Sequence, residues 1–237
     1  MLPTNIMKIL NKDKIANISI LGFFSKNDPV KIIKQKGSVA MQGISDEPWW
    51  YLSLKNHKDF SWYIENTGSD DRFLAVVDDE LLTEVKKRFT CRWILSCQRL
   101  YLPEKVKLPR HDIHTEPLTP DDAEHIYNNS DYKQYTSFGY IATQIRNGSG
   151  LGVRYNSVLV GWILTHDDGA LGMLHVLNEH RRKGIARGLV VEMIKEVTSK
   201  GLTPFTYVEP ENCPSMSLVK NLGFVEDRMV HWVNMNR

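Results

Sequence analysis

The chain has 237 residues and carries 30 Lys and Arg against 28 Asp and Glu, a formal net charge of +2. This balance gives no electrostatic footprint for nucleic acid or an anionic membrane, so we expect neither as a partner. No apolar run approaches the roughly 18 residues that span a bilayer, and the first residues lack the apolar core of a signal peptide. Three cysteines, an odd number, favour a reduced compartment, so we expect a cytoplasmic protein. The sequence does not predict its oligomeric state.

Periodicity predicts an α/β arrangement for the first half of the chain. Apolar residues recur at helical spacing over residues 5–24. Asp78 or Asp79 is suited to cap a helix over 81–89, which the flanking strands would make a β-α-β crossover. Short apolar runs predict strands at 38–42, 49–52, 73–77 and 91–102.

A linker is expected at residues 103–117, where prolines and alternating charges interrupt the apolar pattern. We therefore divide the chain into an N-terminal α/β domain, residues 1–103, and a C-terminal domain, residues 104–237. The second domain reads as a strand, two helices, a three-strand meander, then helix, strand, helix and strand. Its expected elements include strands at 151–155, 157–165 and up to 176, a helix at 185–198 and a strand at 205–210.

The stretch 172–187, GMLHVLNEHRRKGIAR, carries the clearest chemical signal. An apolar strand runs into a turn of cations and glycine that opens a helix. Backbone N–H groups at such a helix start are unpaired and the helix dipole favours anions, so the turn suits a diphosphate. Gly184 lets a phosphate approach closely. The alternative interpretation is an ordinary, solvated basic helix start.

A second pattern follows at residues 211–224, ENCPSMSLVKNLGF. Asn212, Ser215 and Leu218 are spaced along a helix that ends at Leu222, and Phe224 turns back toward the core. With these two patterns in this order, the second half resembles the GNAT superfamily of acyl-CoA-dependent N-acyltransferases. Its first motif is matched by Arg181, Gly184 and Ala186, and its second by Asn212, Ser215, Leu218 and residues 222–224.

The resemblance implies a fold, an activity and a co-substrate. The fold is a GNAT domain with a mixed sheet, preceded by a smaller α/β domain that resembles a degenerate copy of it. The activity is N-acyl transfer from acetyl-CoA, or another acyl-CoA, to a primary amine, by direct attack in a ternary complex. The two-part layout is most similar to the glycine N-acyltransferase-like branch.

The resemblance also implies which residues bind acyl-CoA. Backbone N–H groups of Leu174 and Val176 would contact the thioester and pantetheine, with Asn212 and Ser215 on the opposite side of the slot. The pyrophosphate would lie on the turn and helix start formed by Arg181, Arg182, Lys183, Gly184, Ile185, Ala186 and Arg187. No metal site is expected.

Proton transfer is where the sequence departs from the family. Val219 stands where many members carry a tyrosine acid, and Ala170 stands at the place of the proposed glutamate base of glycine N-acyltransferases. Either other groups act, or the chain is a non-catalytic acyl-CoA-binding or regulatory module. For catalysis, our candidate bases are His175 and, second, Glu209; imidazole titrates near neutral pH. The alternative for His175 is a structural histidine on the sheet.

Acceptor specificity is expected from the segment 128–140 and from the last strand, which carries His231 and Trp232. We expect a small amine or an amino acid as the acceptor, and a peptide or protein N-terminus is the alternative. Lys133 or Arg237 would pair with a carboxylate on that acceptor.

Overall fold

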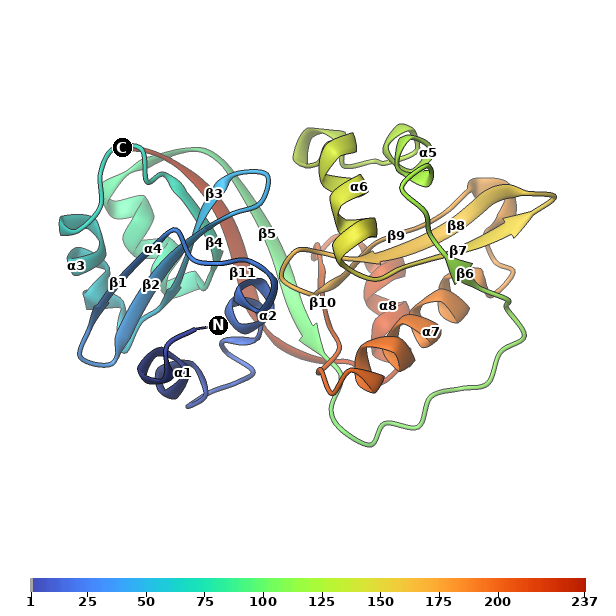
Figure 1. The fold of residues 1–237 in the computed structure, drawn as a ribbon, viewed down its shortest axis with the longest axis horizontal. Helices are drawn as coiled ribbons and strands as arrows, with labels where there is room; N and C mark the ends of the chain where they lie inside the picture. The colour runs from blue at the N-terminus through green and yellow to red at the C-terminus, as the bar shows by residue number, and fades with distance from the viewer. Residues whose placement is uncertain (1) are drawn as a thin grey trace. The chain divides into compact units, whose positions relative to one another are not determined.

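A computed structural model describes residues 2–237 and divides the chain into two compact units (Figure 1). The first unit runs up to Arg99 and also takes in Asp227–Arg237, and the second is Leu100–Glu226. The sequence predicted one break, between residues 103 and 104. The structure instead returns the end of the chain to the first unit, because the last strand pairs there with a strand near residue 75, as His231 opposite Val77 shows.

The first unit has the strand order β1-β2-β3-β4-β11-β5. Neighbouring strands are antiparallel from β1 to β3 and between β4 and β11, whereas β3 and β4 are parallel. Its helices are α1 (Thr4–Leu10), α2 (Ile18–Lys26), α3 (Phe60–Glu65), α4 (Asp79–Arg88) and the 3-10 turn η1 (His57–Asp59). Its strands are β1 (Lys31–Gln35), β2 (Ser38–Ile44), β3 (Pro48–Ser53), β4 (Phe73–Val77), β5 (Thr90–Tyr101) and β11 (Val225–Asn236).

Alternation along the strands of this unit separates two cores. Trp49 and Tyr51 of β3 pack with α1 and α2, whereas Trp50 between them packs with α3 and α4. The helix α4 begins as predicted, because the Asp78 carboxylate accepts from the N–H of Leu81 at 2.8 Å. The predicted crossover differs in one respect, since β11 lies between β4 and β5 in the strand order.

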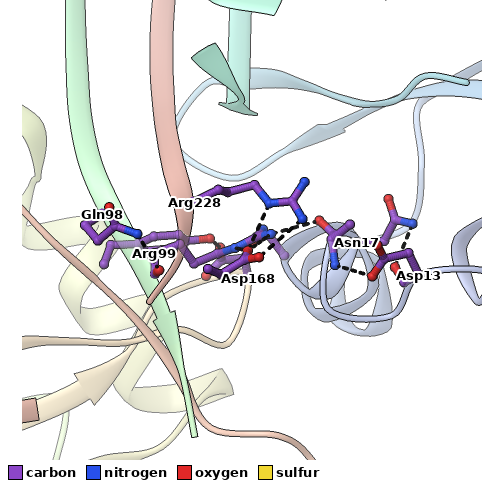
Figure 2. Close-up of polar contacts among 10 residues, drawn as sticks. Asp13, Asn17, Gln98, Arg99, Asp168 and Arg228 are labelled. Carbon is purple, nitrogen blue, oxygen red and sulfur yellow. Dashed lines mark hydrogen bonds and ion pairs between the residues drawn. The ribbon is translucent and has the colours of Figure 1, made fainter. Parts of the chain in front are cut away.

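A buried ion pair ties β11 to β5 in the same unit (Figure 2). The Arg99 side chain is almost fully buried, and its Nε donates to the Asp227 carboxylate at 2.8 Å. The same guanidinium donates to Ser19 and to the Ala16 carbonyl. Arg228 also donates to Asp227, from a side chain that is 39% exposed.

Because a buried charge left without its partner is costly, we expect Arg99→Ala to lower the free energy of unfolding by about 3 kcal/mol. The matched control is Arg228→Ala, which removes an exposed cation from the same carboxylate and should cost less than about 1 kcal/mol. Chemical denaturation of both variants measures the difference. Equal losses for the two variants would contradict the assigned role of Arg99.

The second unit contains the strand order β10-β9-β8-β7-β6. These strands are antiparallel except for β9 and β10, which are parallel. Its strands are β6 (Glu116–Pro117), β7 (Gly150–Tyr155), β8 (Val158–Thr165), β9 (Leu171–Val176) and β10 (Phe205–Val208). Its helices are α5 (Asp122–Asn128), α6 (Phe138–Asn147), α7 (Ile185–Ser199), α8 (Cys213–Asn221) and the 3-10 turns η2 (Lys133–Tyr135) and η3 (Asn178–His180).

Helices cover both faces of this sheet, with α5 and α6 on one face and α7 and α8 on the other (Figure 1). Gly161 of β8 permits the close approach of α7, since an added Cβ would lie 2.9 Å from Cγ2 of Ile185. This contact fixes the start of α7 against the centre of the sheet. The expected α/β fold with a mixed sheet is confirmed. Within residues 2–237, no helix is both long and apolar enough to cross a bilayer.

Candidate functional site

The strands β9 and β10 part soon after they meet. Their paired register within the described residues consists of Leu171 opposite Thr206, at the start of β9. Beyond this pair, β9 continues for five residues to Val176 along β8 alone. The second half of β9 therefore presents one backbone edge to a gap in the sheet.

A β-bulge accompanies this separation. The register of β9 against β8 shifts between Trp162 and Leu164, and Met173 of β9 has φ +52°. Bulges bend a strand and increase its twist, which explains why β9 leaves β10 here. The positive φ of a bulky residue is strained, and such strain is concentrated at functional sites.

The orientation of the exposed edge follows from two hydrogen bonds. The N–H of Leu177 donates to Val160 of β8 at 2.9 Å, so the preceding residue, Val176, directs its N–H and C=O away from β8. The Val176 carbonyl accepts from Nε of Arg181 at 2.9 Å on that side. Arg181 thus holds the end of β9, and the Val176 N–H faces the gap.

The turn before α7 collects unpaired donors. The backbone N–H groups of residues 182–187 have no acceptor within residues 2–237. Arg182 and Gly184 have φ of +61° and +80°, and Gly184 is the N-cap of α7. Left-handed residues at a helix start form concave arrays of N–H groups that bind anions.

Charge and space at the turn fit the same ligand. Arg181, Arg182, Lys183 and Arg187 are exposed to solvent. An added Cβ at Gly184 would meet nothing within 4 Å. Ile185 is buried beneath the turn, and the side chain of Ala186 is only a methyl group, which leaves room for a ligand. The residues present therefore fit a diphosphate, which needs N–H donors, positive charge and room.

Asn212 and Ser215 lie at the start of α8. The side-chain oxygen of Asn212 accepts from the N–H of Ser215 at 3.1 Å, so Asn212 caps this helix. This cap alone explains why Asn212 and Ser215 are three residues apart in the sequence. Both side chains are half-buried, and a role in acyl-CoA binding stays a prediction.

A family model matches part of the second half of the chain, whereas solved structures match most of its length. Residues 149–233 match the family model described as FR47-like protein. A Drosophila melanogaster protein of known structure is 20% identical, with a TM-score of 0.71 over 84% of this chain and 74% of that one. A GCN5-related N-acetyltransferase from Kribbella flavida is 13% identical, with a TM-score of 0.61 over 93% and 94%.

The chain has the GNAT fold. The predicted resemblance to that superfamily is confirmed, while the glycine N-acyltransferase-like branch stays a prediction. A tandem GNAT protein from the clavulanic acid biosynthesis pathway is 14% identical, with a TM-score of 0.53 over 93% of this chain and 88% of that one. No curated protein matches the sequence.

His175 occupies the second half of β9 in the second unit. Its half-buried ring stacks on Trp162, with the ring centroids 4.9 Å apart and an angle of 18° between planes. Neither ring nitrogen has a hydrogen-bond partner within residues 2–237. His175 is therefore not a structural histidine whose ring nitrogens are held by hydrogen bonds. Burial lowers the pKa of His175; nearby Asp131 opposes this shift, and Arg181 and His125 add to it. The side chain is therefore a neutral base at pH 7.

The remaining positions singled out for proton transfer differ in their surroundings. Glu209 follows the end of β10 and is half-buried. Val219 and Ala170, at the places of the family's tyrosine and glutamate, are both buried aliphatic side chains. His175 and Glu209 are consequently the titratable side chains among these four positions.

Three residues that we expected at the acceptor site lie in different surroundings in the structure. Arg237 donates to Thr67 and to the carbonyls of Ile64 and Asp71, so its guanidinium serves the first unit. His231 is 3% exposed and lies between Ser96 and Asp79 of that unit, at 2.8 and 3.1 Å. The sequence predicted Arg237 and His231 as acceptor contacts in the C-terminal domain. The pairing of β11 with β4 places both residues in the first unit instead. Lys133 lies over the Tyr127 ring at 5.8 Å.

Sequence reasoning missed the aromatic surroundings of His175. Trp162 stands opposite His175 in the antiparallel register of β8 and β9, and His125 of α5 packs edge-on against Trp162 at 5.6 Å. These residues are 13 and 50 positions away in sequence. Alternation of β8 and β9 would have placed Trp162 and His175 together only once the bulge was known.

Proposed function

We propose that the protein is an acyl-CoA-dependent N-acyltransferase that transfers acetyl from acetyl-CoA to a primary amine of a small molecule or amino acid. The observation that carries the proposal is the run of six unpaired backbone N–H groups at residues 182–187, beside the gap between β9 and β10. The fold supports it, because GNAT proteins use acyl-CoA as co-substrate. A diphosphate on the turn would leave the pantetheine arm to run along the exposed edge of β9.

The reaction needs a defined set of steps. The amine nitrogen attacks the thioester carbonyl and forms the N–C bond, while the C–S bond breaks and releases the CoA thiolate. One proton leaves the amine nitrogen and one proton reaches the thiolate, so the products are an amide and CoA thiol. The Val176 N–H faces the gap and would stabilise the oxyanion that develops on the carbonyl.

His175 would accept the amine proton. Its nitrogens are unpartnered, its pKa is lowered and it lies one residue before Val176 on the same strand. Glu209, after the end of β10, is the second candidate for this role. The thiolate would take its proton from water, since a buried valine stands at the family's tyrosine position, Val219.

The N-terminal unit would carry no second acyl-CoA. By strand direction its counterpart of β9 is β3, which is antiparallel to β2 and parallel to β4 as β9 is antiparallel to β8 and parallel to β10. However, the edge of β3 that faces β4 is paired in mid-strand, at Trp50 and Tyr51, where the edge of β9 stays open. The helix that follows β3, α3, has Asp59 as its N-cap where α7 has Gly184, which disfavours a phosphate. This unit is a degenerate counterpart with a structural or substrate-shaping role.

The test is release of CoA thiol from acetyl-CoA in the presence of a panel of amines and amino acids, recorded between pH 5 and 9. We expect amine-dependent release. A base with a lowered pKa is neutral and active at pH 7, so kcat at saturating unprotonated amine should fall only when the pH drops below about 6.5 and His175 gains a proton. A fall centred above pH 7 would contradict His175 as the base.

The alternative is a non-catalytic acyl-CoA-binding module, which the aliphatic residues Val219 and Ala170 at the family's acid and base positions favour. It predicts acetyl-CoA binding without amine-dependent thiol release for any acyl chain length. Release with at least one amine would exclude it.

A further inference from the structure

The imidazole of His175 is oriented by ring stacking and not by hydrogen bonds. Neither of its nitrogens has a partner within the described chain, and its ring lies nearly parallel to the Trp162 indole, at 18° and 4.9 Å. A histidine on a strand that is free of hydrogen bonds ordinarily rotates about the bond to its ring. The indole face removes that freedom while it leaves the edge of the imidazole, with both nitrogens, uncovered.

The indole itself is firmly held. Trp162 is 1% exposed and belongs to the core between the sheet and α5 and α6. His125 of α5 packs against it edge-on, at 78° between planes. Register keeps Trp162 opposite His175, so the two side chains share one face of adjacent strands. A rigid core residue thus supports a side chain at the open edge of the sheet.

We propose that Trp162 is a positioning residue, which fixes the His175 ring so that one nitrogen edge faces an amine that enters beside the open half of β9. This inference rests on the proposed function. Trp162 acts only through His175 and touches no reacting atom. Held groups react faster because their orientation is set before the reaction begins, and small errors in it are costly.

Charged and titratable groups around the ring come from α5, from the segment after it and from the turn before α7. Asp131 follows α5, Arg181 precedes α7 and His125 lies in α5. Asp131 favours the protonated imidazole, whereas Arg181 and His125 oppose it. Because His125 packs on Trp162, a substitution that removes the ring changes both contacts, and a variant that keeps a ring at this position is needed for comparison.

The experiment compares Trp162→Leu, which removes the flat ring, with Trp162→Phe, which keeps one. The readouts are steady-state kinetics and the long-range ¹H–¹⁵N spectrum of the His175 imidazole. Trp162→Leu should lower kcat about tenfold at an unchanged KM for acetyl-CoA, and should remove the upfield displacement of the carbon-bound protons of His175 that the indole ring current causes. Trp162→Phe should retain the wild-type spectrum and most of kcat.

Ile141→Ala is the matched control, since Ile141 is a fully buried member of the same core with no ring contact to His175. It should leave the His175 spectrum unchanged even where it lowers stability. An unchanged spectrum and kcat in Trp162→Leu, or equal losses in the Leu and Phe variants, would overturn the proposal.

The wild-type spectrum provides a test that needs no folded variant. A ring stacked on an indole has carbon-bound protons shifted upfield by the ring current, so ordinary His175 shifts would also overturn the proposal. If wild-type protein transfers no acyl group, the proposed function fails. The spectrum still decides whether Trp162 fixes the ring.

Discussion

Gly184→Glu is expected to weaken acetyl-CoA binding by at least about 100-fold. The new carboxylate would extend into open space at the centre of the unpaired N–H groups, where the structure leaves 4 Å clear. Two unit charges about 4 Å apart near a protein surface repel by roughly 4 kcal/mol, which exceeds the 2.7 kcal/mol of a 100-fold change. Calorimetric titration of acetyl-CoA into the variant measures the loss.

Gly201→Glu is the matched control at the other end of the same helix. Gly201 also has a positive φ, +71°, and an added Cβ there would likewise meet nothing within 4 Å. Both variants therefore carry the same charge and a similar backbone strain, of about 1–2 kcal/mol. The control should bind acetyl-CoA like the wild type. Equal affinities for the two variants would remove residues 182–187 as the pyrophosphate site.

His175→Ala is expected to lower kcat by about 100-fold to 1,000-fold, with the KM for acetyl-CoA within about twofold of wild type. General-base catalysis contributes effects of this size, and the cofactor turn lies outside the substituted side chain. Steady-state thiol release at saturating amine measures both constants. The acid limb of the pH profile, assigned to His175, should disappear with the imidazole.

Two further variants make this result specific. Glu209→Gln removes the second candidate base, and a loss of kcat there with wild-type turnover in His175→Ala would transfer the role to Glu209. His114→Ala removes an exposed imidazole that lies before β6 and should leave kcat unchanged. A comparable loss in His114→Ala would show that the assay reports damage to the fold and not loss of a base.

Features with short-range causes were readable from the sequence. Asp78 caps α4, and Gly169 turns the hairpin before β9 at φ +87°. Gly184 begins α7 in the left-handed conformation at the predicted residue. Each depends on a side chain and a backbone angle within a few residues, so one sequence is enough to predict it.

Features with long-range causes were not readable. The pairing of β11 with β4 joins residues more than 150 positions apart, and it carries His231 into the first unit. Apolar alternation in β11 predicts a buried strand but no partner. The stack of Trp162 on His175 likewise depends on a register that the bulge at Met173 sets. Thus the conformation of the turn before α7 was predictable, while the side chains around the candidate base were not.

The strand pairing of the first unit bears on how many acyl-CoA molecules one chain binds. Its β3, which corresponds to β9 by strand direction, pairs with β4 at Trp50 opposite Leu74 and Tyr51 opposite Ala75, so the edge that is open in β9 is occupied in β3. A backbone edge already paired within the chain has no donors left for a pantetheine arm. We therefore expect one acetyl-CoA per chain.

Amide NMR of ¹⁵N-labelled protein titrated with acetyl-CoA would locate the bound co-substrate, because it reports on individual N–H groups. We expect the largest shifts at residues 182–187, a smaller shift at Val176, and none at the start of α4, Asp79 and Glu80. Unchanged signals at 182–187, with shifts at other residues or with no shifts at all, would contradict this expectation.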